Sequence, residues 1–377
     1  MGELVVRGAS RWFDGRWDRA DLAAVNGIVV DAGRDLEDPV IIDGTGLLMS
    51  PGFIDLQCNG GLGIDLTSEP ERMWELAAGL PRWGVTAWLP TIVTSPPEVA
   101  SRALRALNEG PPAGWSGAVP LGLHLEGPFL APARKGAHAE RLLQPPSLAA
   151  VEGWSRQAGV ALVTLAPELD GAVEVIGALV ERGVVVSMGH SDATTQDALA
   201  GIEAGARWVT HLFNAMAPLH HRAPGLAGIA LSDERVHAGL IADGIHVHPA
   251  VVALAQRALG ERLSLVTDAV SALGMPAGQQ RLGRQVVTVG DDGVRLPDGT
   301  LAGSVLSMDQ AVRNLGAFTG CPPEVALRAA STAPARVLGD RTRGGLTDGA
   351  RADVVLLTEA LEVVVTVVGG ELVHERR

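Results

Sequence analysis

Short apolar runs of strand length recur along the chain from residue 51 onward, and they alternate with Ala- and Leu-rich amphipathic stretches. This alternation is typical of repeated βα units around a parallel sheet, whose strands are buried on both faces. Eight such runs are present, at 53–57, 86–93, 121–126, 161–166, 184–190, 208–213, 237–242 and 263–268. Eight units predict an α/β protein with a closed (β/α)8 TIM barrel. A doubly wound open sheet is the alternative that the same pattern allows.

Both ends of the chain show a different pattern, with short β-branched runs separated by Gly and Asp turns and no helix between them. These runs are 4–6, 27–30 and 40–48 near the start, and 352–357, 363–368 and 371–374 near the end. We therefore expect residues 1–50 and 340–377 to form one small β-sandwich from both termini. Residues 51–339 then form the barrel.

The segment between the eighth run and the C-terminal strands departs from the βα pattern. Residues 280–301 contain the turns Asp292-Gly293 and Asp298-Gly299, which predict a β-hairpin excursion. Amphipathic stretches at about 308–318 and 323–331 predict helices.

Length and charge limit the possible functions. A chain of 377 residues suits a barrel of about 250 residues with a smaller attached unit. Apolar residues make up 47% and charged residues 19%, which supports a large packed core rather than disorder. The net charge of -13 argues against a broad nucleic-acid surface, because that surface needs clustered Lys and Arg. An anionic substrate must therefore find a local basic pocket.

Cysteine usage and apolar run length indicate the compartment. The two cysteines, Cys58 and Cys321, are too few for a disulfide framework. The first residues lack a secretory signal pattern, and no run reaches the ~18 apolar residues that a membrane-spanning helix needs. We expect a cytoplasmic protein that contacts neither membrane nor nucleic acid.

Metal-capable side chains lie at the carboxyl ends of the predicted strands, the face where barrel enzymes place their active sites. Glu126, His190 and His211 provide one carboxylate and two imidazoles, a three-ligand set that leaves one position open for water. Asp268, at the end of the eighth run, is then free to carry a proton. One such residue alone is more often a satisfied polar group than a ligand. Four at equivalent strand ends indicate a catalytic metal site.

Several motifs resemble the N-acetylglucosamine-6-phosphate deacetylase family of the amidohydrolase superfamily. In chain order they are PGFIDLQCNG, GLHLEGPFL, KGAH, GHSDAT, THLFNAMAPLHHRAPGLAG, ADGIHVHP, LVTDAVSA and LAGSVLSM, between residues 51 and 308. The run 210–228 is the most specific, whereas PGFID alone indicates only the superfamily. This resemblance implies hydrolysis of the acetamide of N-acetylglucosamine 6-phosphate in amino-sugar catabolism and cell-wall recycling. It also implies a homodimer and the terminal β-sandwich.

The resemblance assigns roles by position. It implies Glu126, His190 and His211 as metal ligands, Asp268 as the acid/base and His138 as the group that helps to polarise the acetyl carbonyl. The implied substrate-binding residues, with one phosphate contact expected from a partner subunit, are Asn214, Ala215, Arg222, His246, Ala302, Gly303 and Ser304. Arg and imidazolium groups suit a phosphate dianion because they form charge-assisted hydrogen bonds. Without the resemblance, Arg222 and His246 are equally consistent with ordinary loop solvation.

Two departures from other superfamily members predict one divalent ion per subunit. Many members have a His-x-His pair at the end of the first strand, whereas this chain has Gln57 and Asn59, and amides are poor ligands for a tightly held transition metal. The only lysine is Lys135, so the fourth strand cannot supply a carboxylated lysine between two metals. Zn²⁺ is the expected ion, and Fe²⁺, Co²⁺ and Mn²⁺ suit the same ligands. Cys58 is interpreted as a small buried apolar residue rather than a thiolate ligand.

Some positions leave questions open. His124, two residues before Glu126, is a candidate partner of that carboxylate, and Ala223 stands where the family commonly has Glu.

Two other functions compete with the deacetylase. A related amidohydrolase acting on another N-acyl amine would need different contacts at the phosphate end, and a catalytically inactive sensor of amino-sugar phosphates would not need Asp268.

Overall fold

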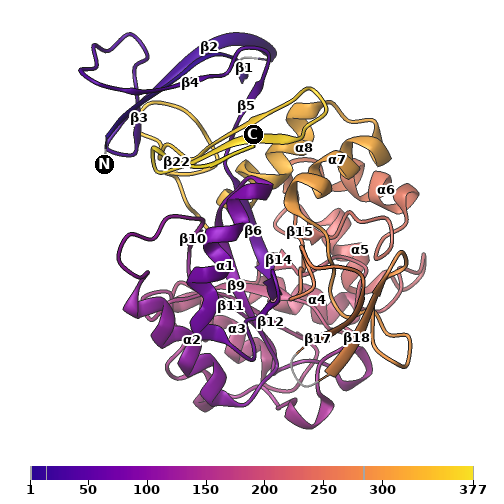
Figure 1. Ribbon diagram of the computed structural model, residues 1–377. Helices are drawn as coiled ribbons and strands as arrows, with labels where there is room; N and C mark the ends of the chain where they lie inside the picture. The colour runs from indigo at the N-terminus through magenta and orange to yellow at the C-terminus, as the bar shows by residue number, and fades with distance from the viewer. Residues whose placement is uncertain (1, 14, 283–284, 377) are drawn as a thin grey trace.

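Parallel strands form a barrel in the computed structural model, which describes residues 2–13, 15–282 and 285–376 (Figure 1). The barrel strands are β6 (Phe53–Cys58), β9 (Val85–Val93), β11 (Leu123–Glu126), β12 (Val160–Leu165), β13 (Val185–Met188), β14 (Trp208–Val209), β15 (His237–Leu240) and β16 (Leu263–Leu265). Each pairs in parallel with the next, and β10 (Val119–Pro120) also pairs with β9. Each of the eight expected runs overlaps one of these strands.

Contacts between the first and last barrel strands close the sheet. The backbone N–H of Asp268 donates to the Gln57 carbonyl at 2.9 Å, and the backbone N–H of Asn59 donates to the Ala269 carbonyl at 2.8 Å. Cys58 and Ala269 form a parallel bridge. The closed (β/α)8 barrel is therefore confirmed, and the open-sheet alternative is wrong. Strands β6 and β12 are buried at every position, as expected of strands covered on both faces.

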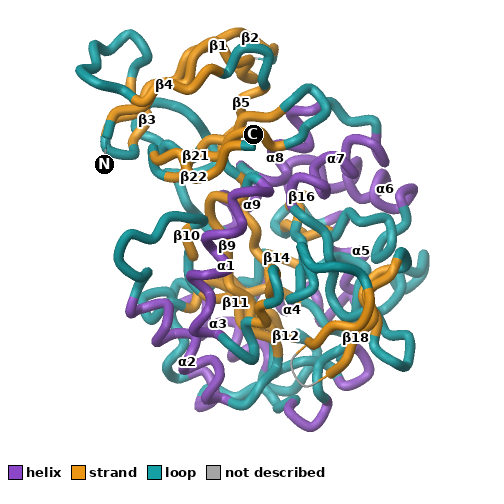
Figure 2. Tube along the Cα trace, viewed as in Figure 1, coloured by secondary structure: helices purple, strands orange, loops and turns teal. Residues whose placement is uncertain are grey.

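Helices surround the barrel strands (Figure 2). They are α1 (Met73–Gly79), α2 (Pro97–Glu109), α3 (Ala172–Glu181), α4 (Thr195–Glu203), α5 (Gly225–Ser232), α6 (Pro249–Leu259), α7 (Met308–Thr319), α8 (Pro323–Ala330) and α9 (Thr332–Val337). Short 3₁₀ turns lie at Pro70–Arg72, Leu80–Trp83, Pro132–Arg134, Glu140–Leu142, Ala149–Val151 and Gly260–Arg262. The helices expected near 308–318 and 323–331 are confirmed. Helix α9 escaped prediction because Pro334 suggests a break, yet proline is tolerated in a first helical turn. Among the described residues, no helix combines the length and apolar character needed to cross a membrane.

Strands from both ends of the chain form a second sheet beside the barrel, where the indigo and yellow segments lie together (Figure 1). They are β1 (Glu3–Phe13), β2 (Arg16–Val25), β3 (Ile28–Val30), β4 (Val40–Asp43), β5 (Leu48–Pro51), β20 (Val354–Leu357), β21 (Val363–Val368) and β22 (Glu371–Glu375). The sheet order is β22-β21-β20-β5-β1-β2-β3, with β4 also paired to β1. One apolar core joins both ends through residues such as Val6, Leu22, Val354 and Val367.

The excursion after β16 is a small sheet of β17 (Gly278–Leu282), β18 (Gln285–Gly290) and β19 (Gly293–Arg295). A separate apolar cluster packs it against the segment that follows β16, through Val270, Ala272, Val289 and Val294. Another short pair, β7 (Gly60–Gly61) and β8 (Ile64–Asp65), follows β6. These segments build up the rim at the carboxyl ends of the barrel strands.

Candidate active site and metal centre

A cavity of about 1360 Å³ opens at the carboxyl ends of the barrel strands. Its lining includes these residues singled out from the sequence: Asn59, Glu126, Lys135, His138, His190, His211, Asn214, Ala215, His246, Asp268, Ala302 and Gly303. Sites of this kind in barrel enzymes are built from the loops that follow the strands. The fold therefore brings most of the expected site residues to one place.

Three ligand atoms converge inside this cavity. Glu126 Oε1 lies 3.1 Å from His190 Nε2 and 3.2 Å from His211 Nε2, and the two imidazole nitrogens lie 3.1 Å apart. Ligand atoms held at about 2.0–2.1 Å by a tetrahedral ion lie about 3.3–3.4 Å from one another. The three side chains thus have the spacing and the donor chemistry that a divalent cation requires.

The carboxylate of this trio is ionised. Burial alone would raise the pKa of Glu126, but its contacts with the neighbouring imidazoles of His190 and His211 hold it well below its usual range. The same contacts with Glu126 raise the pKa of His211, although burial opposes this shift. A negative charge in a buried pocket needs a positive partner, which a divalent cation held by these three side chains would supply.

His190 has a fixed tautomer. Its Nδ1 lies 2.9 Å from the carbonyl oxygen of Arg134, and a carbonyl can only accept a hydrogen bond. Nδ1 therefore carries the hydrogen, and Nε2 presents its lone pair to the cavity. A histidine ligand is commonly oriented by a hydrogen bond from its other ring nitrogen.

Left-handed backbone conformations place several of these side chains. His190, His211 and Asp268 have φ values of 50°, 30° and 48°, a region that residues other than glycine seldom adopt. Each of these residues follows the end of a short strand and turns the chain over the barrel mouth. Strained residues of this kind cluster at functional sites, where the surrounding structure holds them.

Asp268 is held by amide donors from the first strand. Asn59 Nδ2 donates to its Oδ1 at 2.6 Å, and Gln57 Nε2 donates to the same atom at 3.1 Å. Gln57 Nε2 also donates to Glu126 Oε1 at 3.0 Å. Burial, and next the charge of Glu126, raise the pKa of Asp268 to about 6. A carboxyl group with this pKa is suited to proton transfer near neutral pH.

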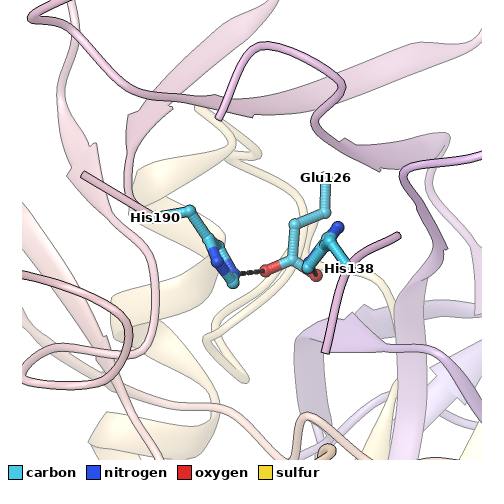
Figure 3. Close-up of side chains that lie close together, drawn as sticks. All are labelled: Glu126, His138 and His190. Carbon is cyan, nitrogen blue, oxygen red and sulfur yellow. Dashed lines mark hydrogen bonds and ion pairs between the residues drawn. The ribbon is translucent and has the colours of Figure 1, made fainter. Parts of the chain in front are cut away.

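His138 comes from the loop after β11 and lies beside Glu126 and His190 (Figure 3). Its Nε2 lies 3.9 Å from Glu126 Oε2, and its ring packs edge-on against His190 with a centroid distance of 4.5 Å. Ligand atoms of Glu126, His138 and His190 all lie within 4.8 Å of one another, so His138 is geometrically a possible alternative ligand. Burial, and next the neighbouring His190, lower the pKa of His138 to about 3, so its ring is neutral.

Of three other candidate substrate residues, His246 lies in the cavity, whereas Ser304 and Arg222 do not. His246 lies in the cavity, and its Nδ1 is 2.6 Å from Asp243 Oδ2. Ser304 is buried and donates to the Thr267 carbonyl, away from the cavity. Arg222 is exposed and lies outside the residues that line the cavity, with Nη1 only 2.8 Å from His221 Nε2. The structure therefore does not bring Arg222 to the cavity of its own chain.

Two other side chains were interpreted from the sequence, and the structure agrees with the interpretation of Cys58 but not with that of His124. His124 lies in the barrel core, with Nδ1 3.1 Å from the Leu56 carbonyl and Nε2 2.7 Å from Thr164 Oγ1, rather than against Glu126. Cys58 is buried, and burial raises the pKa of its thiol well above the usual value, so a thiolate is disfavoured.

The sequence analysis missed Thr94, Asp243 and the Arg134 carbonyl, which contact His138, His246 and His190. Thr94 directly follows β9, so the same strand-end position that singled out Glu126 was available as a signal. A backbone carbonyl has no such signal, because any residue supplies one.

Comparisons with known proteins agree with this geometry. The family described as "Amidohydrolase family" matches residues 48–373. N-acetylglucosamine-6-phosphate deacetylase of Rattus norvegicus is 44% identical over 348 residues, which cover 88% of this chain and 84% of the relative. N-acetylgalactosamine-6-phosphate deacetylase of Escherichia coli O157:H7 is 41% identical and covers 86% of this chain and 87% of its own.

A solved structure shows the same fold. It is a mutant N-acetyl-D-glucosamine-6-phosphate deacetylase from Mycobacterium smegmatis in complex with N-acetyl-D-glucosamine-6-phosphate. Its TM-score is 0.87 at 35% identity, and the match covers 99% of this chain and 100% of that one. Such identity over nearly the full length identifies the family as well as the fold. The chain therefore belongs to the N-acetylglucosamine-6-phosphate deacetylases of the amidohydrolase family.

Proposed function

We propose that the protein hydrolyses the acetamide of N-acetyl-D-glucosamine 6-phosphate to D-glucosamine 6-phosphate and acetate. The observation that carries this proposal is the convergence of Glu126, His190 and His211 at 3.1–3.2 Å beside a buried carboxyl group, Asp268. The full-length similarity to deacetylases of this substrate supports the choice of substrate. A sensor function would leave the proton-carrying position of Asp268 unexplained.

We further propose that Glu126, His190 and His211 hold one divalent cation per subunit, with Zn²⁺ the expected ion. When bound there, the cation polarises the acetamide carbonyl and makes water more acidic. The amide donors Gln57 and Asn59 hold Asp268 next to this site without adding a charge. Asp268 is therefore placed to act on a proton rather than to bind the ion.

The proton path follows from these positions. Asp268 takes a proton as the water oxygen forms its bond to the carbonyl carbon, and His138 donates a hydrogen bond to the carbonyl oxygen. Asp268 then gives the same proton to the amine nitrogen as the carbon–nitrogen bond breaks. Acetic acid and the free amine leave, the acid loses its remaining proton to solvent to give acetate, and Asp268 is again a carboxylate.

The sugar phosphate end is assigned to the loops after the later strands. We propose that Asn214, Ala215, His246, Ala302 and Gly303, which all line the cavity, bind the sugar phosphate. Arg222 contacts the phosphate of the partner subunit's substrate in a homodimer, because its exposed position outside the cavity leaves it available to a second chain. An Arg and an imidazole provide charge-assisted donors in an otherwise acidic protein.

Acetate release and metal content, measured on the same preparation, test the proposal. The purified protein should contain one tightly bound divalent ion per chain and should release acetate from N-acetylglucosamine 6-phosphate in preference to unphosphorylated N-acetylglucosamine. N-acetylgalactosamine 6-phosphate belongs in the same panel, because a relative of comparable identity is named for that sugar. Two tight ions, each required for turnover, would contradict the metal assignment. Absence of acetate release from every sugar phosphate would contradict the reaction.

The organisation of the whole protein completes the proposal. We propose that residues 1–50 and 340–377 are one β unit attached to a barrel of residues 51–339, and that the enzyme acts in the cytoplasm. Support for the division comes from β5, which ends at Pro51 in the terminal sheet, and from β6, which begins at Phe53 in the barrel. Pairing of β5 with β20 holds the two ends of the chain together.

A further inference from the structure

His138 is anchored through the nitrogen that faces away from the ligand trio. Its Nδ1 lies 2.8 Å from Thr94 Oγ1, and the Thr94 backbone N–H points at the same nitrogen with an N···N distance of 3.3 Å. Both side chains are largely buried, at 8% and 6% exposure, so water does not compete strongly for these contacts. Thr94 thus provides the contacts that decide which ring nitrogen of His138 carries the hydrogen.

The backbone contact distinguishes the two neutral tautomers. A backbone N–H can only donate, so Nδ1 of His138 must accept, and the ring hydrogen must be on Nε2. In the opposite tautomer, the N–H of Thr94 would face the N–H of the ring, and a buried donor would lose its partner. The Thr94 hydroxyl has one hydrogen, which can go to His138 Nδ1 at 2.8 Å or to the Glu126 carbonyl at 3.3 Å, and the shorter distance favours an unprotonated Nδ1 as its acceptor.

Neighbouring His190 has the opposite arrangement. Its Nδ1 faces the carbonyl of Arg134, an acceptor, which leaves a lone pair on Nε2. Two adjacent imidazoles therefore present opposite functions to the same cavity. His190 presents a lone pair suited to a cation, and His138 presents an N–H suited to an oxygen atom.

We propose that Thr94 is a positioning residue that holds His138 as the Nε2–H tautomer, so that this ring donates to the substrate carbonyl and does not bind the cation. This inference rests on the proposed hydrolysis for the identity of the carbonyl. It separates His138 from His211, although both lie close to Glu126.

The backbone near Thr94 leaves room for the hydroxyl group that contacts His138. Thr94 follows β9, and Glu126 ends β11, which pairs with β9 in register Glu126–Val93. Thr94 Oγ1 lies 3.3 Å from the Glu126 carbonyl. Gly127 has φ +87°, and a Cβ atom there would lie 2.2 Å from Thr94 Oγ1. The hydroxyl therefore occupies space that only glycine leaves free, which connects the position of Glu126 to that of His138.

The tautomer can be measured without turnover. We would record long-range proton–nitrogen spectra of the zinc-loaded protein with ¹⁵N-labelled histidine rings, and assign the His138 signals by their loss in His138→Gln. The expected spectrum shows an unprotonated Nδ1 and a protonated Nε2 at His138, with the reverse arrangement at His190. A protonated Nδ1 at His138, or a zinc-bound Nε2, would overturn the proposal.

Two variants of Thr94 connect the tautomer to catalysis. Thr94→Val removes the hydroxyl but keeps the shape and the backbone N–H, and Thr94→Ser keeps the hydroxyl as the matched control. Loss of one neutral hydrogen bond predicts that kcat of Thr94→Val falls about 2- to 13-fold with KM little changed, while the retained backbone N–H keeps the His138 hydrogen on Nε2. Thr94→Ser should resemble the wild type in both measurements. A wild-type kcat in Thr94→Val would overturn the role of the hydroxyl, and a protonated Nδ1 at His138 in this variant would overturn the role of the backbone N–H.

These outcomes separate this inference from the proposed function. If the wild type released no acetate from any hexosamine phosphate, the proposed reaction would fail, whereas the ring spectra would still decide whether Thr94 sets the tautomer. If acetate is released and His138 has its hydrogen on Nδ1, only the role of Thr94 fails.

Discussion

Substitution of Asp268 by Asn removes a proton carrier with little change of shape. The carboxyl group is buried, and its Oδ1 accepts hydrogen bonds from Asn59 Nδ2 at 2.6 Å and from Gln57 Nε2 at 3.1 Å. An asparagine oxygen can accept both of these bonds, so the side chain should keep its orientation. The trio Glu126, His190 and His211 is not altered, and the variant should retain its cation.

The expected magnitude follows from the two proton transfers that the proposed mechanism assigns to Asp268. General acid–base catalysis is commonly worth about 10²–10⁴-fold, and one residue here serves both the attack of water and the departure of the amine. We expect kcat to fall by at least about 10²-fold with KM little changed, because substrate contacts lie elsewhere. A fall of 10³-fold corresponds to about 4 kcal/mol of lost transition-state stabilisation.

Three measurements on one preparation check this prediction: steady-state acetate release, metal content per chain and the thermal unfolding midpoint. An inactive variant with normal metal content and a normal midpoint supports the acid/base role. Loss of the cation together with activity would make Asp268 a ligand and leave the proton to another residue, such as His138. Turnover at the wild-type rate would refute the mechanism.

Three further predictions concern the phosphate contact of Arg222, the pH dependence of kcat/KM and the contribution of Gly127 to stability. Arg222→Ala should raise KM about 10- to 150-fold, since a charge-assisted contact is worth about 1.5–3 kcal/mol. It should also reduce the preference for the 6-phosphate over the unphosphorylated sugar, and an unchanged preference in kinetic assays would refute the contact. Burial and the charge of Glu126 raise the pKa of Asp268 to about 6, and the base form of Asp268 exists above that pKa. As the pH drops below about 6, Asp268 gains one proton and kcat/KM should therefore fall. A bound cation shifts this limb to lower pH, so a limb centred above pH 7 would contradict the assignment. Gly127→Ala should lower the free energy of unfolding by about 1–3 kcal/mol, because a methyl group there meets Thr94 at a positive φ. Gly110→Ala, which has a similar φ of +79° and no atom within 4 Å of the added Cβ, is the matched control, and equal losses in denaturant titrations would exclude the clash as the cause.

The apolar runs predicted which segments become barrel strands, but not where those strands end. The sixth run was expected over 208–213, whereas β14 contains only Trp208 and Val209. His211 and Phe213 have φ values of 30° and 76°, so the chain turns within the apolar run. Residues of these types normally avoid that conformation, and their side-chain chemistry gives no sign of it. The turn depends on packing against neighbouring strands, which a hydrophobic pattern does not encode.

In the terminal sheet, the apolar pattern failed to predict one strand, β2. Strand β2 begins with polar residues, and Arg16, Arg19 and Asp21 are exposed. Only the part from Ala20 onward packs against the apolar core of this sheet. Strand β1 supplies the hydrogen-bond partners along the whole length of β2, so pairing rather than patterning defines this element.

The amide pair at positions 57 and 59 gives a physical reason for the expectation of a single cation. Imidazoles at these positions would present lone pairs between Glu126 and Asp268, two carboxylates that a second cation could bridge. Gln57 instead donates one hydrogen bond to each carboxylate, at 3.0 and 3.1 Å, and Asn59 donates to Asp268. These neutral donors reduce the repulsion between the two carboxylates without adding the charge that would hold Asp268 permanently ionised. We infer that the amides leave Asp268 able to gain and lose a proton, so the residues that remove a second metal site also create the acid/base.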